Sequence, residues 1–477
     1  MPKSSGKYVY SASATTHRVA VIDTSSLRID VIDAGRTPTA VAPMIPANDQ
    51  SGAVAVLSHG SDQVALIRTP PSSGSEVRLV DITADANQLA VSPDGRMVIA
   101  YHDVDIKPEL PPSSDQELSV VLADDPERTY AFSVGAHPRD VVFNAASSRA
   151  YVTTDDGVNV LDLDSLDGMD KPPLVVVTEE TGLDPTTVEV QIAAEANLAI
   201  ARVQDEKMLL ATDLASGSQF RVDLPGYPTD VDIADDGSFV IATVPGKTRS
   251  RIIELRLPAT SPDDVREFEV AGGEYVGVTA LAPSGDAMLL YTTVDPWAED
   301  DDADDHPDPR KRMTIARRVG RDWADFISLY TEIPIRAVGI APDSGNAILL
   351  HDEAPDLNPA APWPYTLLDL RAQVPLKKLQ HVEAKPSSFL FTPDGDRSVV
   401  LVRDDALGVQ RADLIDLGNF IVANVPLGSP PEGAGYVGAT DKIFISQAHR
   451  SGRLSFIDDT GAIETATGFE LNDSIKD

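Results

Sequence analysis

The stretch LAVSPDGRMVIAYHD, from Leu89 to Asp103, decides the fold, because weaker copies of it recur along the chain. The copies are VDIADDGSFVIATV at Val231, TALAPSGDAMLLYTT at Thr279, VGIAPDSGNAILLHDE at Val338 and FLFTPDGDRSVVLVRDD at Phe389. A short apolar strand closed by Asp follows many of them, as in VAVIDTSSL. Self-similarity of this kind is the signature of repeat architectures, in which no single unit can bury its own faces.

Each unit is predicted to contain four short strands. Pro93, Asp94 and Gly95 predict a tight turn after the first strand, because Pro presets φ, Asp binds neighbouring amides and Gly accepts a positive φ. Prolines open three successive units about 45 residues apart: Pro138, Pro185 and Pro228. No segment has the sustained 3.6-residue apolar period of a long helix. We therefore predict an all-β fold, a β-propeller of four-stranded antiparallel blades.

The repeats also predict the domain organisation. About 8–10 repeat units can be counted, and one large ring is favoured over two smaller propellers divided near residues 246–261. Residues 1–6 are expected to be a disordered N-terminal lead, and residues 7–477 the propeller. Three insertions follow second strands and are expected on one face, where loops carry function more often than the scaffold does. They span residues 103–116, 295–312 and 352–364.

Composition excludes several classes of site. The chain has 75 acidic and 39 basic residues, a net charge of −36, so it would repel a nucleic-acid backbone. It contains no cysteine, which excludes disulfides, thiolate nucleophiles and cysteine-zinc sites. Hydrophobic residues make up 42% and aromatic residues only 5%, so the core is predicted to consist mostly of Val, Leu, Ile and Ala.

Some of the repeat residues carry a family resemblance. Tyr8-Val9-Tyr10-Ser11 and Val21-Ile22-Asp23-Thr24 resemble the strands of the YVTN-repeat β-propellers, and Tyr151-Val152-Thr153-Thr154 is the nearest full copy of that motif. The resemblance implies a bacterial or archaeal protein of the cell-envelope and surface-layer type. The motif consists of packing and turn residues, so it specifies a fold strongly and a function hardly at all.

The sequence leaves the compartment open. No apolar run approaches the ~18 residues that a membrane helix needs, and no signal peptide is recognisable before Lys7. The chain is then either cytoplasmic or a form from which an export signal was removed. The Ser-rich lead MPKSSG, so close to the first strand, favours a periplasmic or cell-surface protein.

The densest charge lies in the longest insertion. Its aspartates are candidate Ca²⁺ ligands, because carboxylate oxygens are the ligands that this ion prefers. They are Asp300, Asp301, Asp302, Asp304 and Asp305. Their spacing does not fit an EF-hand loop, and a solvated acidic loop, neutralised by the following Arg310-Lys311-Arg312, is the alternative.

Histidines recur at the ends of second strands. These are His59, His102, His351 and His449, and Asp103 and Asp352 follow two of them. Imidazole binds divalent transition metals and a neighbouring carboxylate can orient it, so a metal site on this face is one reading. The other reading is a solvated rim, since carboxylates such as Asp404 take the same place in other units.

Two tryptophans lie in insertions. Trp297 and Trp363 either anchor a partner or fix their loops to a blade. The motifs of serine hydrolases, P-loop proteins, zinc proteases and dinucleotide-binding proteins are missing. The favoured function is therefore a non-catalytic binding or scaffold propeller that takes a protein or small ligand on the insertion face. The alternative is a metal-dependent hydrolase of the lactonase type, whose site would include His102, His351 and nearby carboxylates.

Overall fold

The repeated turn forms as its residues predict. In the computed structural model, Gly95 has a φ of 70°, and a Cβ at this position would collide with the carbonyl oxygen of Met44. Asp94 Oδ1 accepts hydrogen bonds from Ser92 Oγ at 2.6 Å and from the amide of Arg96 at 3.1 Å. These bonds hold the chain reversal between the first two strands of the unit.

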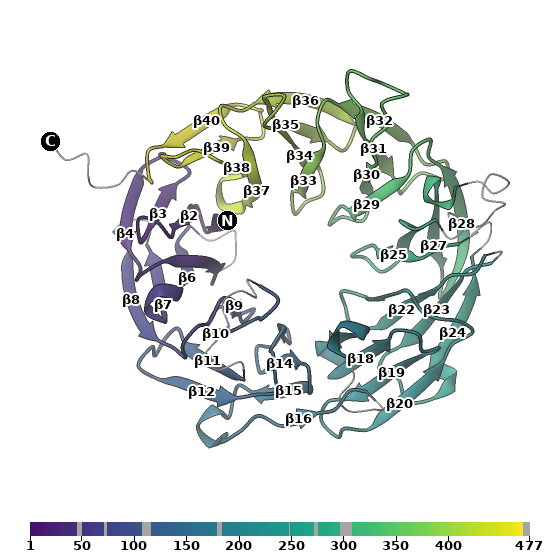
Figure 1. Cartoon of the computed structure of the whole chain (residues 1–477), viewed down its shortest axis with the longest axis horizontal. Coiled ribbons are helices and arrows are strands. Elements are labelled where there is room, and N and C mark those ends of the chain that lie inside the picture. Colours follow the sequence, from purple (N-terminus) through teal and green to yellow (C-terminus); the bar gives the residue numbers. More distant parts are fainter. Residues whose placement is uncertain are drawn as a thin grey trace. The chain divides into compact units, whose positions relative to one another are not determined.

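The structure describes residues 1–44, 50–70, 74–106, 116–178, 184–247, 249–270, 275–295 and 308–470. In this part of the chain the strands form ten four-stranded antiparallel sheets, each in plain sequence order (Figure 1). We number these sheets as blades 1 to 10 along the chain. The prediction of an all-β propeller built from four-stranded blades is confirmed.

Contacts divide the blades into two compact units. Unit 1 comprises Met1–Gly182 and Leu427–Asp477, and unit 2 comprises Leu183–Pro426. The predicted alternative division near residues 246–261 is wrong, because β23 (Arg251–Arg256) lies inside it and pairs with a strand on each side.

Unit 1 holds blades 1 to 4 and blade 10. Blade 1 is β1 (Lys3–Ser5), β2 (Tyr8–Ser13), β3 (Arg18–Asp23) and β4 (Ile29–Asp33), and blade 2 is β5 (Pro38–Pro43), β6 (Gly52–Ser58), β7 (Gln63–Thr69) and β8 (Glu76–Asp81). Blade 3 is β9 (Gln88–Val91), β10 (Met97–Tyr101), β11 (Glu117–Leu122) and β12 (Thr129–Ser133). Blade 4 is β13 (Asp140–Phe143), β14 (Arg149–Thr154), β15 (Gly157–Asp162) and β16 (Leu174–Val175), and blade 10 is β37 (Pro431–Val437), β38 (Lys442–Gln447), β39 (Arg453–Ile457) and β40 (Ile463–Thr467).

Unit 2 holds blades 5 to 9. Blade 5 is β17 (Val188–Ala193), β18 (Leu198–Val203), β19 (Met208–Asp213) and β20 (Gln219–Asp223), and blade 6 is β21 (Asp230–Ile233), β22 (Phe239–Val244), β23 and β24 (Val265–Glu269). Blade 7 is β25 (Val278–Leu281), β26 (Ala287–Tyr291), β27 (Arg312–Val319) and β28 (Asp322–Tyr330), and blade 8 is β29 (Ile335–Ile340), β30 (Asn346–His351), β31 (Trp363–Asp369) and β32 (Lys377–Val382). Blade 9 is β33 (Pro386–Phe391), β34 (Arg397–Asp404), β35 (Val409–Asp416) and β36 (Ile421–Pro426).

Helical structure in the described residues is limited to short 3-10 turns. They are η1 (His59–Ser61), η2 (Leu166–Gly168), η3 (Pro185–Thr187), η4 (Ala194–Ala196), η5 (Pro262–Asp264), η7 (Pro309–Lys311) and η8 (Gly438–Thr440). None of the described helices has the length and hydropathy needed to span a bilayer.

The first and last blades pack against each other within unit 1. Val9 and Ile22 of blade 1 share a buried cluster with Phe444 and Phe456 of blade 10. Ser4 Oγ in β1 donates a hydrogen bond of 2.6 Å to the carbonyl oxygen of Tyr436. Two smaller propellers in sequence would not place these blades side by side. The expected disordered lead is also wrong, because β1 pairs with β2 from the third residue onward.

Neighbouring blades of unit 2 are joined through buried apolar faces and through buried carboxylates, of which Glu254 makes the most contacts between blades 6 and 7. Glu254 on β23 is 1% exposed. It lies 2.5 Å from the guanidinium of Arg318 on β27 and accepts a 2.8 Å hydrogen bond from Trp323 Nε1 on β28. The guanidinium carbon of Arg318 also lies 4.0 Å from the centre of the Phe239 ring. Blade 6 is thus fixed to blade 7 by charge as well as by packing.

The three insertions leave their blades where predicted, between second and third strands. Residues 103–106 follow β10, residues 292–295 follow β26 and residues 352–362 join β30 to β31. The rest of the first two insertions, residues 107–115 and 296–307, lies outside the described residues. Trp363 belongs to β31 rather than to the loop before it.

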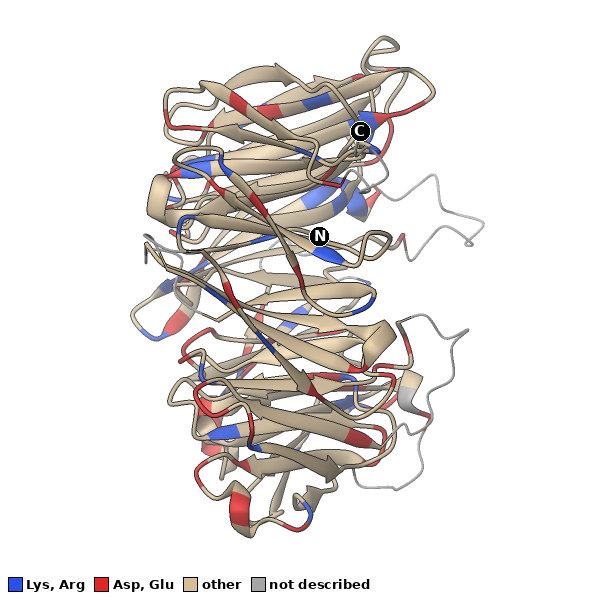
Figure 2. Cartoon of the chain, turned by 90° about the vertical axis from the view of Figure 1, so that its left-hand side faces the viewer, with Lys and Arg blue, Asp and Glu red and all other residues tan. Residues whose placement is uncertain are grey.

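The acidic excess is spread along the chain. Figure 2 shows Asp and Glu over both strands and loops, with Lys and Arg among them. Many of the cations pair locally, as Arg202 does with Glu189 at 2.7 Å. Most such pairs are partly exposed and contribute little stability each.

Candidate functional site

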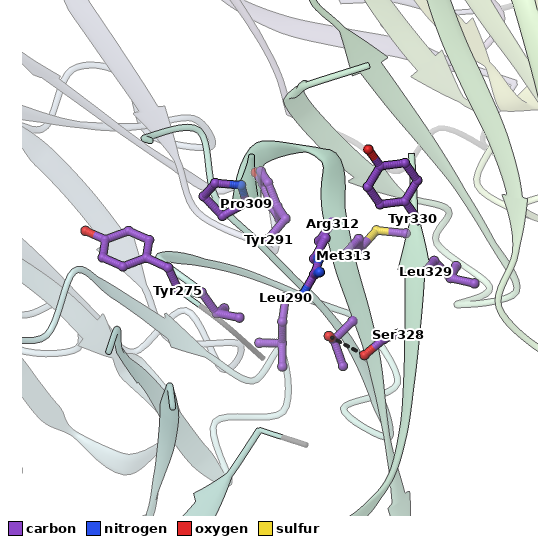
Figure 3. Close-up of a pocket in the computed structure, with 11 residues that line it drawn as sticks. Tyr275, Leu290, Tyr291, Pro309, Arg312, Met313, Ser328, Leu329 and Tyr330 are labelled. Atoms are coloured by element: carbon purple, nitrogen blue, oxygen red, sulfur yellow. Dashed lines mark hydrogen bonds between the residues drawn. The ribbon is translucent and has the colours of Figure 1, made fainter. Parts of the chain in front are cut away.

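The insertion end of blade 7 contains a pocket of about 250 Å³. Figure 3 shows Tyr275 and Tyr330 on opposite sides of it, with Arg312 and Leu290 between them. Its remaining lining includes Tyr291, Pro309 and Met313. Three tyrosines and an arginine in one small hollow are unusual in a chain with only 5% aromatic residues.

Blade 7 itself brings these residues together. Tyr291 is the last residue of β26 and Arg312 the first of β27, so the insertion between them begins and ends at the pocket. Antiparallel pairing places Arg312 opposite Tyr330, the last residue of β28. Tyr275 enters just before β25 with a φ of 32°, in the left-handed region that non-glycine residues rarely adopt.

The pocket grades from a buried base to an exposed rim. Met313 is 2% exposed and Tyr291 9% exposed, whereas Tyr330 is 54% exposed. At the base, Thr314 and Ser328 approach each other at 3.4 Å between their hydroxyl oxygens (Figure 3). A side chain entering the hollow would therefore pass the exposed ring of Tyr330 and meet apolar atoms and two hydroxyl groups at the base.

Charge beside the pocket comes from both neighbouring insertions. Asp308 caps η7 through the amide of Arg310, and its two carboxylate oxygens bind the Arg310 guanidinium at 3.0 and 2.9 Å. This pair raises the pKa of Arg310, and the fields of Asp295 and Asp352 add to it. The predicted residue Asp352 on blade 8 therefore acts on the insertion of blade 7.

Behind Tyr291 lies a group of carboxylates on first strands. Asp230 Oδ2 on β21 accepts a 2.6 Å hydrogen bond from the amide of Thr279 on β25. Burial and the Asp230 carboxylate raise the pKa of Asp232 to about 7, against the effect of a hydrogen bond from the amide of Leu281. Burial and these two carboxylates raise the pKa of Tyr291 to about 12. The hydrogen bond from Thr279 to Asp230 therefore joins blade 7 to blade 6 near the pocket.

The repeat-tail histidines bind main-chain carbonyls between blades. His102 Nδ1 lies 2.6 Å from the carbonyl oxygen of Asp85, and His59 Nδ1 lies 3.2 Å from that of Ala86. Two of the predicted histidines thus converge on the connection between blades 2 and 3. A carbonyl oxygen can only accept, so each Nδ1 carries the proton.

His351 has a similar but more buried role. Its Nδ1 lies 3.3 Å from the carbonyl oxygen of Pro334 and its Nε2 lies 2.8 Å from Thr366 Oγ1. Burial lowers the pKa of His351 to about 4. The ring is therefore neutral, with Nδ1 donating and Nε2 accepting, and neither nitrogen is left for a metal ion.

Asp103, which follows His102 in the sequence, lies in an ionic network with Asp105 and Arg139. Its Oδ1 accepts a 2.9 Å hydrogen bond from the amide of Asp105. Arg139 on the following connection binds the carboxylates of Asp105 and of Asp155, the latter at 2.7 Å. Burial raises the pKa of Asp103, and the Asp105 carboxylate acts in the same direction.

The remaining predicted residues that the structure describes make separate contacts. Exposed His449 accepts a hydrogen bond from the hydroxyl of Ser451, and Asp404 closes a turn by accepting from the amides of Ala406 and Leu407. Trp363 packs at the edge of the blade 8 core with Lys385 Nζ 5.5 Å from its ring centre. This contact favours the reading in which the tryptophan fixes its loop to the blade.

The predicted calcium ligands and one tryptophan belong to the longest insertion. Trp297 and the five aspartates between residues 300 and 305 lie outside the described residues. Within the described ranges, no three His, Asp or Glu side chains are grouped so that they could hold a metal ion.

Sequence reasoning did not single out the tyrosine pocket. Tyr291 lies near the end of the repeat copy that begins at Thr279. This position was the signal in the sequence that could have indicated the pocket. Tyr275 and Tyr330 come from other segments: the pairing of β27 with β28 brings Tyr330 to the pocket, and the segment before β25 brings Tyr275.

Comparisons with known proteins support the fold. No protein-family model and no curated protein matches the chain. Among solved structures, the crystal structure of the eukaryotic initiation factor is 12% identical to this chain, with a TM-score of 0.54 and 98% coverage of both chains. Dihydro-heme d1 dehydrogenase NirN in complex with DHE is 11% identical, with a TM-score of 0.46 and coverage of 97% of this chain and 73% of that one. Apo AztD from Citrobacter koseri is 13% identical, with a TM-score of 0.44 and coverage of 85% and 92%. At these identities the likeness concerns the fold alone.

Proposed function

We propose that this protein is a non-catalytic binding module whose insertion end on blade 7 receives a side chain of a protein partner. The observation that carries the proposal is the pocket between the two ends of the longest insertion, lined by Tyr275, Tyr291 and Tyr330. Tyrosine and arginine dominate the energetic centres of protein interfaces, because they combine a large apolar body with a polar end.

The size of the pocket decides between ligand classes. Pockets for small molecules and cofactors usually have 300–1,000 Å³, and this one has about 250 Å³. That volume suits one large apolar or aromatic side chain better than a whole cofactor. The exposed ring of Tyr330 and the strained backbone at Tyr275 support a recognition role, because backbone strain is retained mainly at functional positions.

The contacts of the described histidines argue against the metal-dependent hydrolase. Its two named histidines bond to main-chain carbonyls in different connections, and nothing else in the described residues favours it. The resemblance of the repeats to YVTN proteins supports a bacterial cell envelope as the place of the proposed binding role.

A pair of matched tyrosines tests the proposal. Tyr330 and Tyr227 lie in the same unit and are 54% and 52% exposed, but only Tyr330 lines the pocket. N-acetyl-tryptophanamide, titrated against the protein and followed by isothermal calorimetry, should bind the wild type at millimolar concentration. Tyr330→Ala should weaken this binding at least about fivefold, while Tyr227→Ala should not change it.

A photo-crosslinking amino acid at each position extends the test to natural partners. A defined partner trapped from position 330 and not from position 227 would support the proposal. Equal trapping at both positions, or equal loss of tryptophanamide binding in both alanine variants, would contradict it.

A further inference from the structure

Blade 4 differs from the other blades in its fourth strand and in the connection that leads to it. Its fourth strand, β16, has only two residues and pairs only with Val158 and Asn159. The connection before it, residues 163–173, is the longest between a third and a fourth strand in the ten described sheets. It contains η2, whose Leu166 is buried against the interface of blades 3 and 4.

This enlarged connection forms one wall of a hollow of about 410 Å³ between blades 3 and 4. Met97, Leu122 and Leu166 provide apolar lining. The hollow opens at the end of the blades where the first strand turns into the second, so it is separate from the insertion end that carries the tyrosine pocket.

A polar triad holds the wall in place. Arg128 and Tyr130 of blade 3 both bind Asp167 of the enlarged connection, with distances of 2.7–2.8 Å. Arg128 also donates to the Tyr130 hydroxyl at 2.7 Å. These hydrogen bonds lower the pKa of the Asp167 carboxyl, with Tyr130 contributing most. The hollow is therefore built by specific bonds between two blades.

A second hollow adjoins the first. It has about 320 Å³, lies between blades 2 and 3, and shares Arg96 and Asp124 with its neighbour. Asp124 binds Arg68 at 2.8 Å and Arg96 at 3.5 Å, so one carboxylate pairs with two guanidinium groups at the boundary between the hollows. We call the two adjoining hollows the turn-end groove.

The charges of the lining residues determine which class of ligand the groove would bind. Its arginines are paired with Asp124 or Asp167, whereas the exposed carboxylates of Asp125 and Asp164 have no cation partner among the described residues. The apolar lining of the groove complements an apolar side chain of a ligand, and the two carboxylates without a cation partner complement a cationic side chain beside it. An anionic ligand would meet repulsion from these carboxylates and from the net charge of −36.

We propose that the turn-end groove binds an extended segment of another protein, in which lysine or arginine residues alternate with large apolar residues. The apolar side chains occupy the two hollows, and the cations face Asp125 and Asp164. This site differs in unit, in blade end and in ligand charge from the pocket of blade 7, so either proposal stands if the other fails.

Three fluorescein-labelled peptides test the inference by anisotropy with the full chain. GKLKLKG supplies cations and apolar anchors, GKSKSKG supplies the cations alone and GELELEG supplies the anchors with the opposite charge. We expect GKLKLKG to bind at least about tenfold more tightly than either of the others, because neither charge nor apolar contact alone fills the groove.

Matched variants locate the binding. Asp125→Asn with Asp164→Asn should weaken GKLKLKG about fivefold, while Asp205→Asn with Asp459→Asn changes net charge equally and should have no comparable effect. Ser165→Trp, at an exposed residue whose side chain makes no capping bond, should fill the hollow and abolish binding. Circular dichroism checks that each variant is folded.

Four outcomes would overturn the proposal. Equal binding of GKSKSKG and GKLKLKG would show attraction to net charge alone, and so would equal loss in the two double variants. Unchanged binding by folded Ser165→Trp would place the peptide elsewhere. Self-association of the wild type that Ser165→Trp abolishes, measured by sedimentation, would assign the groove to a second copy of this chain.

Discussion

His102 Nδ1 donates a hydrogen bond of 2.6 Å to the main-chain carbonyl oxygen of Asp85. His351 makes the same contact with Pro334, and in both cases the acceptor lies 17 residues earlier in the chain. The two histidines stand at the same place in their repeats and bind the connection that leads into their own blade. This position therefore fixes the passage from one blade to the next.

The burial of His351 predicts a loss of stability in acid. Its pKa is lowered to about 4 in the folded protein, whereas a histidine in the unfolded chain titrates near 6.5. As pH falls from 6.5 to 4 the unfolded chain gains a proton that the folded state does not bind, so the free energy of unfolding should fall by about 2–3 kcal/mol from this group.

The variant His351→Gln should be less stable than the wild type at pH 7 but should lose less stability between pH 7 and 4.5. Urea unfolding at both pH values measures this, and exposed His449→Gln is the control. An unchanged acid dependence in His351→Gln would disprove it.

Asp232 should act in the opposite direction. Its folded pKa of about 7 lies above that of an unfolded aspartate. Between about pH 4 and pH 7 the folded state holds a proton that the unfolded chain releases, so this group makes the protein less stable as pH rises. Asp232→Asn should therefore gain about 3–4 kcal/mol over the wild type at pH 8, with the gain vanishing near pH 4. Guanidinium unfolding at both pH values, with exposed Asp205→Asn as control, tests the sign. A gain of the same size at both pH values would refute the titration.

The carboxylate of Glu254 should be far more costly to remove than an exposed one. Glu254→Ala leaves Arg318 and Trp323 without their buried acceptor, and we expect a loss of about 3–5 kcal/mol. Glu269→Ala removes an ion pair with Arg249 at 3.1 Å in which both side chains are more than half exposed, so it should cost less than about 1 kcal/mol. Denaturant midpoints of the two variants give the comparison, and similar losses would contradict the assigned role.

The contact of blades 1 and 10 should contribute strongly to stability. Phe456 is fully buried between them, and Phe456→Ala should cost about 3–5 kcal/mol through lost burial and the cavity left behind. Removing the exposed Val31 side chain of β4 by Val31→Ala should change stability by less than about 0.5 kcal/mol. Thermal unfolding followed by calorimetry distinguishes the two, and a small effect of Phe456→Ala would argue against the packing.

The sequence predicted those features that neighbouring residues determine. Asp94 and Gly95 make the turn expected of them, and Asp394 with Gly395 repeat it in blade 9. The tyrosine pocket escaped prediction because Tyr291 and Tyr330 meet through strand pairing, and Tyr275 joins them from the segment before β25. The repeat-tail histidines were located correctly, but their partners are main-chain carbonyls, which leave no trace in a residue pattern.

The packing of blade 10 on blade 1 has a consequence for synthesis on the ribosome. Val9 and Ile22 are translated with blade 1, but Phe444 and Phe456, which cover them, are translated only with blade 10, after the eight blades between. The apolar face of blade 1 must then remain without this cover while those blades are synthesised. The synthesis of blade 10, and not the completion of any early repeat, is the moment at which this face can be buried.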